Sequence, residues 1–111
     1  MVTNRLFRKL ALSFPGAVEQ QHFQKTSFRV KKKIFATLDE STGLAVLKFS
    51  LVDQSVFTDI SKGAIFPVQG GWGKSGYSYV ILKKIKIAML KDAMKLSYTC
   101  VAPKKLVNDI H

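Results

Sequence analysis

This sequence has very few of the residues that usually build chemical sites. Its 111 residues include one cysteine, two histidines and seven Asp and Glu residues. The single cysteine, Cys100, excludes a disulfide within the chain and favours a reducing, intracellular compartment; in a helical pattern we expect it to be packed. His22 and His111 are too few for a histidine-based metal site or a catalytic triad without further partners. We therefore expect no enzyme activity, no metal and no cofactor.

Long apolar runs are also absent. No uninterrupted apolar segment approaches the ~20 residues that a membrane-spanning helix needs. The N-terminal segment MVTNRLFRKLALSFPG mixes charged with apolar side chains, so it predicts a folded helix and not a signal peptide. The content of 47% hydrophobic and 23% charged residues is that of an ordinary globular domain. We expect one domain over residues 1–111, monomeric and cytoplasmic, with no membrane contact.

Positive charge is what the sequence has in excess. The formal net charge is +11, made up of +7 over residues 1–38, −1 over residues 39–80 and +5 over residues 81–111. Charge of this size attracts polyanions over long range, although it does not specify a fold. Nucleic acid is therefore one partner class to consider.

The apolar spacing in the first half predicts one helix followed by strands. Thr3 can cap a helix over residues 4–13, whose apolar residues recur every three or four positions until Pro15 and Gly16 end it. Four segments then have the β-branched, aromatic and alternating character of strands: VEQQHF, TSFRV, KIFATL and GLAVLKFS. In the last of these, Lys48 is expected on the face opposite Leu47.

The second half predicts two more helices and one strand. Ser50 and Asp53 fit a capping box that starts a helix over residues 51–61, and a last helix is expected over residues 87–101. Their apolar stripes are Val52, Val56 and Ile60 in the first, and Leu90, Met94, Tyr98 and Val101 in the second. Between them, AIFPVQGGWGKSG has too many glycine and proline residues for a helix and predicts an ordered irregular loop, while YSYVILKKI predicts a strand.

This order of elements indicates a fold class. Strands grouped together, with helices flanking them, favour an antiparallel sheet. We predict an α+β fold in which a sheet of about five strands carries helices packed on one face.

Four segments resemble the MmcQ/YjbR family in order and spacing: LALSFPGAVEQ, SFRVKKKIFATL, FPVQGGWGKSGYSYVIL and LKDAMKLSYTCVAPKKL. The residues that match the family's turn, hairpin and glycine-rich signature are Pro15, Gly16 and Glu19; Phe28, Arg29, Val30 and the lysines that follow; and Trp72, Gly73, Lys74, Gly76 and Tyr77. The resemblance implies a CyaY-like curved antiparallel sheet backed by helices, protruding hairpins that form a double wing, and DNA binding. Tyr77 stands where relatives often have Trp, and Lys86 where a helix-capping Asp or Ser is expected.

The first candidate site is the lysine tip, which we define as Lys31, Lys32 and Lys33. These residues fall between two predicted strands, so they should project from a hairpin turn, where like charges repel. The tip either guards strand edges or neutralises phosphates, helped by Arg29, which the alternation of the strand directs away from Phe28. Lysine attracts phosphate without discriminating bases, so binding would be largely independent of sequence.

The second candidate site is the segment GGWGKSGY. It places Lys74 beside Trp72 and Tyr77, which either pack over the sheet edge or stack on a base or small ligand. It is not a P-loop, because the spacing GxxxxGK[ST] is absent and a strand follows. Lys83 and Lys84, before the last helix, add further charge.

We therefore predict a non-enzymatic domain that binds DNA or another polyanion through basic hairpin wings. The candidate binding residues are Arg29, Lys31, Lys32, Lys33, Lys74, Lys83 and Lys84, with Trp72 and Tyr77 as a stacking or ligand pocket. The alternative is a module that binds a small molecule or a protein beside the Trp72 loop and has no nucleic-acid role. A response of Trp72 fluorescence to a ligand at high salt, where phosphate attraction is screened, would favour that alternative.

Overall fold

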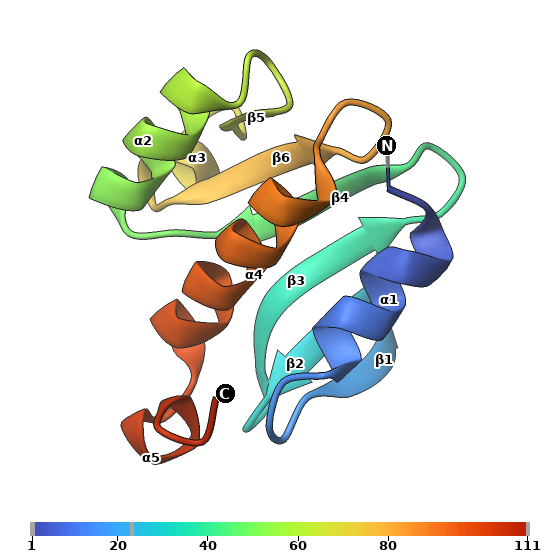
Figure 1. Ribbon diagram of the computed structural model, residues 1–111, viewed down its shortest axis with the longest axis vertical. Coiled ribbons are helices and arrows are strands. Elements are labelled where there is room, and N and C mark those ends of the chain that lie inside the picture. Colours follow the sequence, from blue (N-terminus) through green and yellow to red (C-terminus); the bar gives the residue numbers. More distant parts are fainter. Residues whose placement is uncertain (1, 23, 111) are drawn as a thin grey trace.

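The computed structural model describes residues 2–22 and 24–110, and these form a six-stranded antiparallel sheet with helices (Figure 1). The elements in chain order are α1 (Asn4–Leu12), β1 (Val18–His22), β2 (Lys25–Val30), β3 (Lys33–Asp39), β4 (Leu44–Lys48), α2 (Leu51–Ile60), β5 (Ile65–Pro67), α3 (Gly71–Lys74), β6 (Tyr77–Ile81), α4 (Ile87–Val101) and α5 (Lys104–Val107). The strand order is β1-β2-β3-β4-β6-β5. The predicted α+β class is confirmed, with one strand more than the expected five. No helix among the described residues is long and apolar enough to cross a membrane.

The two faces of the sheet differ in burial. One face carries the core, and its buried side chains include Phe28, Ala36, Leu38, Ala45, Leu47 and Val80. Helices α1 and α4 lie against this covered face (Figure 1), where Phe7 of α1 packs on Phe28 with ring centroids 5.9 Å apart. On the opposite face, Thr37, Val46 and Tyr79 are register partners across β3, β4 and β6 and are only half-buried. This second face is open to solvent.

Helices α1 and α4 follow their predicted apolar stripes. The Thr3 hydroxyl accepts a hydrogen bond of 3.1 Å from the backbone N–H of Leu6, as expected for an N-cap. In α4, Leu90, Met94 and Tyr98 are buried. The Tyr98 hydroxyl donates to the carbonyl of Pro15 and thereby fastens α4 to the turn after α1. Burial raises the pKa of the Tyr98 phenol above its ordinary value, with a smaller contribution from the negative charge of Asp109.

Helix α2 begins as predicted but turns a different side toward the core. Ser50 caps it by accepting from the N–H of Asp53 at 3.1 Å. The stripe Val52, Val56 and Ile60 faces solvent, and Val52 is 73% exposed. Gln54 is buried instead, because its side-chain amide donates to the carbonyl of Gly73 at 2.9 Å and to the Ser78 hydroxyl at 3.0 Å. The buried side of α2 therefore consists of Gln54 and of Phe57, whose ring stacks on Phe49 with centroids 5.1 Å apart, and not of the predicted stripe.

The segment expected to be an irregular loop contains β5 and α3, so that prediction was wrong in part. Ile65 of β5 pairs with Val80 of β6 and adds an edge strand to the sheet. The glycines have a packing role: a Cβ on Gly73 would lie 1.8 Å from the carbonyl oxygen of Val68, and one on Gly76 would lie 1.9 Å from that of Phe49. The glycine-rich signature therefore allows backbone segments to approach closely. Past this segment, β6 ends at Ile81, earlier than the predicted strand.

Candidate nucleic-acid interface

The lysine tip forms a strained hairpin turn. Val30 pairs with Lys33 across β2 and β3, so Lys31 and Lys32 alone make the turn. Both have positive φ, 50° and 69° respectively, which is the geometry of a type I′ turn and favours Asn-Gly. A residue other than glycine in this region costs about 1 kcal/mol or more. The tip therefore carries charge at the expense of local stability.

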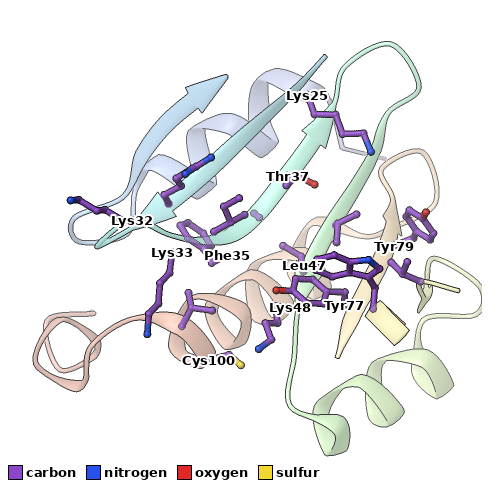
Figure 2. A pocket seen from close by; sticks show the side chains of 17 residues that line it. Lys25, Lys32, Lys33, Phe35, Thr37, Leu47, Lys48, Tyr77, Tyr79 and Cys100 are labelled. Carbon is purple, nitrogen blue, oxygen red and sulfur yellow. The ribbon is translucent and has the colours of Figure 1, made fainter. Parts of the chain in front are cut away.

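The open face of the sheet contains a groove of about 770 Å³, which we call the basic groove (Figure 2). It extends from β2 and β3, across β4 and β6, to α3 and the last turn of α4. Its lining residues are Lys25, Arg29, Lys32, Lys33, Ile34, Phe35, Ala36, Thr37, Val46, Leu47, Lys48, Val68, Trp72, Tyr77, Tyr79, Cys100 and Val101. In Figure 2, Lys25 and Lys32 lie near opposite ends of β2, while Tyr77 and Tyr79 lie across the sheet from them.

The electrostatics of the basic groove are of one sign. Five basic residues line it and no Asp or Glu does: Lys25, Arg29, Lys32, Lys33 and Lys48. Within residues 2–22 and 24–110, both ion pairs are made by Arg8, with Glu19 at 3.0 Å and with Glu40. Among these residues no groove cation is therefore in an ion pair, although the Asp39 carboxylate interacts with Lys25 over a longer range. Like charges held on one face raise the local concentration of anions.

Aromatic rings form the side of the basic groove nearest to α3. Trp72 is 66% exposed and meets Tyr77 edge to face, with ring centroids 5.0 Å apart and an interplanar angle of 76°. The Lys48 ammonium lies 5.5 Å from the centroid of the Tyr77 ring, a cation–π distance. Tyr79, two residues further along β6 and on the same face of the sheet, also lines the groove.

The sheet opens where α4 reaches the basic groove. Regular pairing of β3 with β4 begins at Ala36 and Leu47, and just before it the hydroxyl of Ser97 bridges the two strands. That hydroxyl donates to the carbonyl of Phe35 at 2.6 Å and accepts from the N–H of Lys48 at 2.9 Å. The Ser97 hydroxyl takes the place of a direct hydrogen bond between β3 and β4. The last turn of α4 can therefore line the groove from the covered face of the sheet. Cys100 is consequently exposed there, and the expectation that it would be packed was wrong.

The structure unites part of the two candidate sites predicted from sequence. Arg29, Lys32 and Lys33 line the same groove as Trp72 and Tyr77, so the basic hairpin and the aromatic loop are two sides of one surface. Arg29 points to the open face as predicted, and its Nε donates to the hydroxyl of Ser27 at 3.1 Å.

Other predicted residues lie elsewhere. Lys31 is on the turn but does not line the groove, and Lys74 is exposed on α3 outside it. Lys83 and Lys84 follow β6 at the end where Ile81 pairs with Leu44, which is the end of the sheet away from the lysine tip. These residues add positive charge without joining the groove.

Sequence reasoning missed Lys25, Lys48 and Tyr79 as members of a site. A usable signal was present, because alternation places Lys48 opposite the buried Leu47. Alternation alone does not reveal that β4 and β6 are neighbours. Register pairing of Lys48 with Tyr77 comes only from the fold.

Metal-ligating side chains are not gathered in the described part of the chain. No group of three or more His, Cys, Asp or Glu residues there could hold an ion. The side chain of His22 and all of His111 lie outside the described residues. The expectation of no metal and no cofactor stays a prediction.

Comparison with known proteins identifies the family. The YjbR family model matches residues 12–100. This chain belongs to the YjbR family. The resemblance noted in the sequence is thus confirmed. No curated protein matches the chain.

The fold has a solved counterpart. The crystal structure of the Deinococcus radiodurans protein DR2400, described as carrying the domain DUF419, is similar with a TM-score of 0.81. The likeness covers 98% of this chain and 88% of that chain at 19% sequence identity. At that identity the likeness establishes a shared fold and nothing about activity. The activity of this YjbR-family protein has to be inferred from its own surface.

Proposed function

We propose that this YjbR-family protein binds nucleic acid, DNA in the first instance, through the basic groove and with little sequence preference. The observation that carries the proposal is the convergence of five cations, from β2, the β2–β3 turn, β3 and β4, on a groove that no carboxylate lines. Phosphate contacts of this kind position a nucleic acid and supply affinity, but they do not read its bases. The proposal includes no catalytic step.

The lysine tip supports the proposal independently of net charge. Lys31 and Lys32 occupy turn positions that Asn and Gly would occupy with less strain. Strained backbone positions tend to occur where function requires a residue that the fold does not favour. Lys32 and Lys33, which line the groove from the tip, are the residues expected to contact phosphate first.

Titration of a labelled oligonucleotide tests the proposal at two salt concentrations. The wild-type protein is compared with the double variant Lys32→Ser, Lys33→Ser and with the matched double variant Lys83→Ser, Lys84→Ser. Both variants lose two exposed lysines, but only the first pair lines the groove. Removing two phosphate contacts should lower affinity about tenfold or more at low salt and reduce the salt slope by about 1.4 for a single strand.

The matched variant gives the control. The Lys83→Ser, Lys84→Ser change should alter affinity about twofold or less, since long-range attraction alone is affected. If the wild type fails to bind at low salt, or if the two double variants lose affinity equally, nucleic-acid binding by the groove is wrong.

A small-molecule site is the second candidate, and the size of the groove favours it. A volume of about 770 Å³ falls within the range of about 300–1,000 Å³ typical of ligand pockets. A mononucleotide that saturates the groove with an affinity insensitive to salt, and that shifts Trp72 fluorescence, would support this candidate over a polymeric partner.

A further inference from the structure

Phosphate binding requires only the cations of the basic groove, so it does not explain why aromatic residues, Trp72 and Tyr77, form one side of it. We infer that the nucleic acid bound there is single-stranded, with a base stacked on Trp72 while the groove cations hold the backbone. The inference depends on the proposed nucleic-acid function and narrows it to a class of strand. The inference applies to single-stranded DNA and single-stranded RNA alike, because both carry unpaired bases on a phosphate backbone.

Trp72 is held in place yet largely uncovered. The carbonyl of its neighbour Gly73 accepts a hydrogen bond of 2.9 Å from Gln54, which anchors α3 to α2. The indole contacts Tyr77 edge to face and remains 66% exposed. A large aromatic ring that is both oriented and exposed is a surface on which a planar group can stack with little loss of side-chain freedom.

One groove cation, Lys48, lies beside the aromatic pair of Trp72 and Tyr77. Lys48 and Tyr77 are register partners on β4 and β6, and cross-strand partners have Cβ atoms about 5 Å apart. The Lys48 ammonium covers one side of the Tyr77 ring, which leaves Trp72 as the exposed ring of the pair. A phosphate at Lys48 would therefore place an attached base beside Trp72.

A duplex cannot use this arrangement. Its bases are stacked on one another, and only their edges face the grooves. Unpaired bases have accessible faces, and proteins that bind single strands combine a basic groove with aromatic stacking in this way. The lysine tip could still attract a duplex, but Trp72 would not contribute to that binding.

Intrinsic fluorescence gives a direct readout, because Trp72 is the one tryptophan in the chain. Three probes of about twelve nucleotides are titrated at low and high salt: an oligo-dT strand, a strand of the same length made of abasic sites, and a duplex. An oligo-U strand is added in parallel. Oligo-dT or oligo-U should quench Trp72, whereas the abasic strand and the duplex should bind with little quenching.

Substitutions separate stacking from charge. Trp72→Ala should weaken single-strand binding about tenfold, measured by anisotropy of a labelled strand, and leave abasic-strand and duplex binding within about twofold. Trp72→Phe should keep most of the single-strand affinity, since it retains a ring. Phe66→Ala serves as the control, because Phe66 is an exposed aromatic residue on the adjacent edge strand that does not line the groove.

The outcomes distinguish this inference from the proposed function. Equal affinity for single strand, abasic strand and duplex, with no effect of Trp72→Ala, would overturn stacking while leaving phosphate binding intact. Absence of binding to every probe at low salt would overturn both. Quenching of wild-type Trp72 by oligo-dT or oligo-U, together with a loss of single-strand affinity in Trp72→Ala measured by anisotropy, supports the inference, and the ratio of the two affinities shows whether the groove prefers the thymidine or the uridine strand.

Discussion

The two hairpin turns that flank β3 are built in opposite ways. In the β3–β4 turn, the Asp39 carboxylate accepts from the Ser41 hydroxyl at 2.6 Å and from the Ser41 N–H at 3.1 Å. Gly43 supplies the positive φ of 71° that the turn needs. In the β2–β3 turn, the positive φ angles fall on Lys31 and Lys32. Of the two turns, one uses residues that favour its geometry and the other uses residues that oppose it.

The turns at the two ends of β3 therefore differ in what explains their residues: local stability explains one, and binding is proposed to explain the other. The β3–β4 turn is explained by its own hydrogen bonds and by glycine. The β2–β3 turn is not explained by local stability, but it places Lys32 and Lys33 at the rim of the basic groove. Substitutions that make the two turns more alike therefore test whether the lysine tip serves binding.

The largest effect is expected from giving the tip the residues its geometry favours. The double variant Lys31→Asn, Lys32→Gly should lower oligonucleotide affinity severalfold, since the groove loses the cation of Lys32 and the turn loses the nearby charge of Lys31. The same variant should raise the free energy of unfolding by about 1 kcal/mol, because backbone strain is relieved. Anisotropy titration measures the first change and urea denaturation measures the second.

Lys62→Gly is the matched control for that variant. Lys62 also has positive φ, 53°, and is exposed, but it follows α2 and does not line the groove. It should gain stability by a similar relief of strain and keep nearly full affinity. A tip variant that is more stable and binds as well as the wild type would show that the tip lysines have no part in binding.

The reverse exchange, Gly43→Lys, should have a smaller effect. A lysine at φ 71° is strained, although its Cβ would meet nothing within 4 Å, so stability should fall by about 1 kcal/mol. Affinity should change little despite the added charge, because Gly43 does not line the groove. Gly43→Asn, which tolerates positive φ better, is the control; a severalfold gain in affinity of the Lys variant alone would mean that net charge governs binding.

The smallest effect concerns the carboxylate of the β3–β4 turn. The Ser41 hydroxyl, as the main cause, holds the pKa of Asp39 below its ordinary value. A depressed pKa means that the ionised carboxylate stabilises this turn at neutral pH and that the contribution is lost as pH falls through the pKa of the folded state. Ser41→Ala should raise the Asp39 pKa in a carboxyl NMR titration, whereas Ser75→Ala, which removes a hydroxyl from the residue that caps the end of α3, should leave it unchanged.

Local sequence patterns were sufficient to predict the elements that do not depend on one particular neighbour. The apolar stripes of α1 and α4 predicted their buried sides, because any apolar surface can receive them. Thr3 and Ser50 predicted helix starts for the same reason, since a cap bonds only to its own helix. Lys86 likewise begins α4 without a side-chain cap, as its position suggested.

Features that depend on particular neighbours were not predictable. The orientation of α2 follows from its two buried residues, Phe57 and Gln54, and the acceptors of Gln54, Gly73 and Ser78, are distant in sequence. The short β5 strand forms because Ile65 pairs with Val80 of β6. The basic groove combines Lys25, Lys48 and Tyr79 only after β2, β4 and β6 have taken their places in the sheet. Charge and aromatic content indicated the chemistry of the site, while the sheet order determined its members.

Amide chemical-shift mapping on addition of single-stranded DNA tests the central claim most directly. If the basic groove is the binding site, the largest shifts should occur at Arg29, Lys33, Lys48 and Tyr77 and at the indole N–H of Trp72. Shifts that cluster instead around Lys83 and Lys84, or along the exposed stripe of α2, with the groove signals unmoved, would contradict the account.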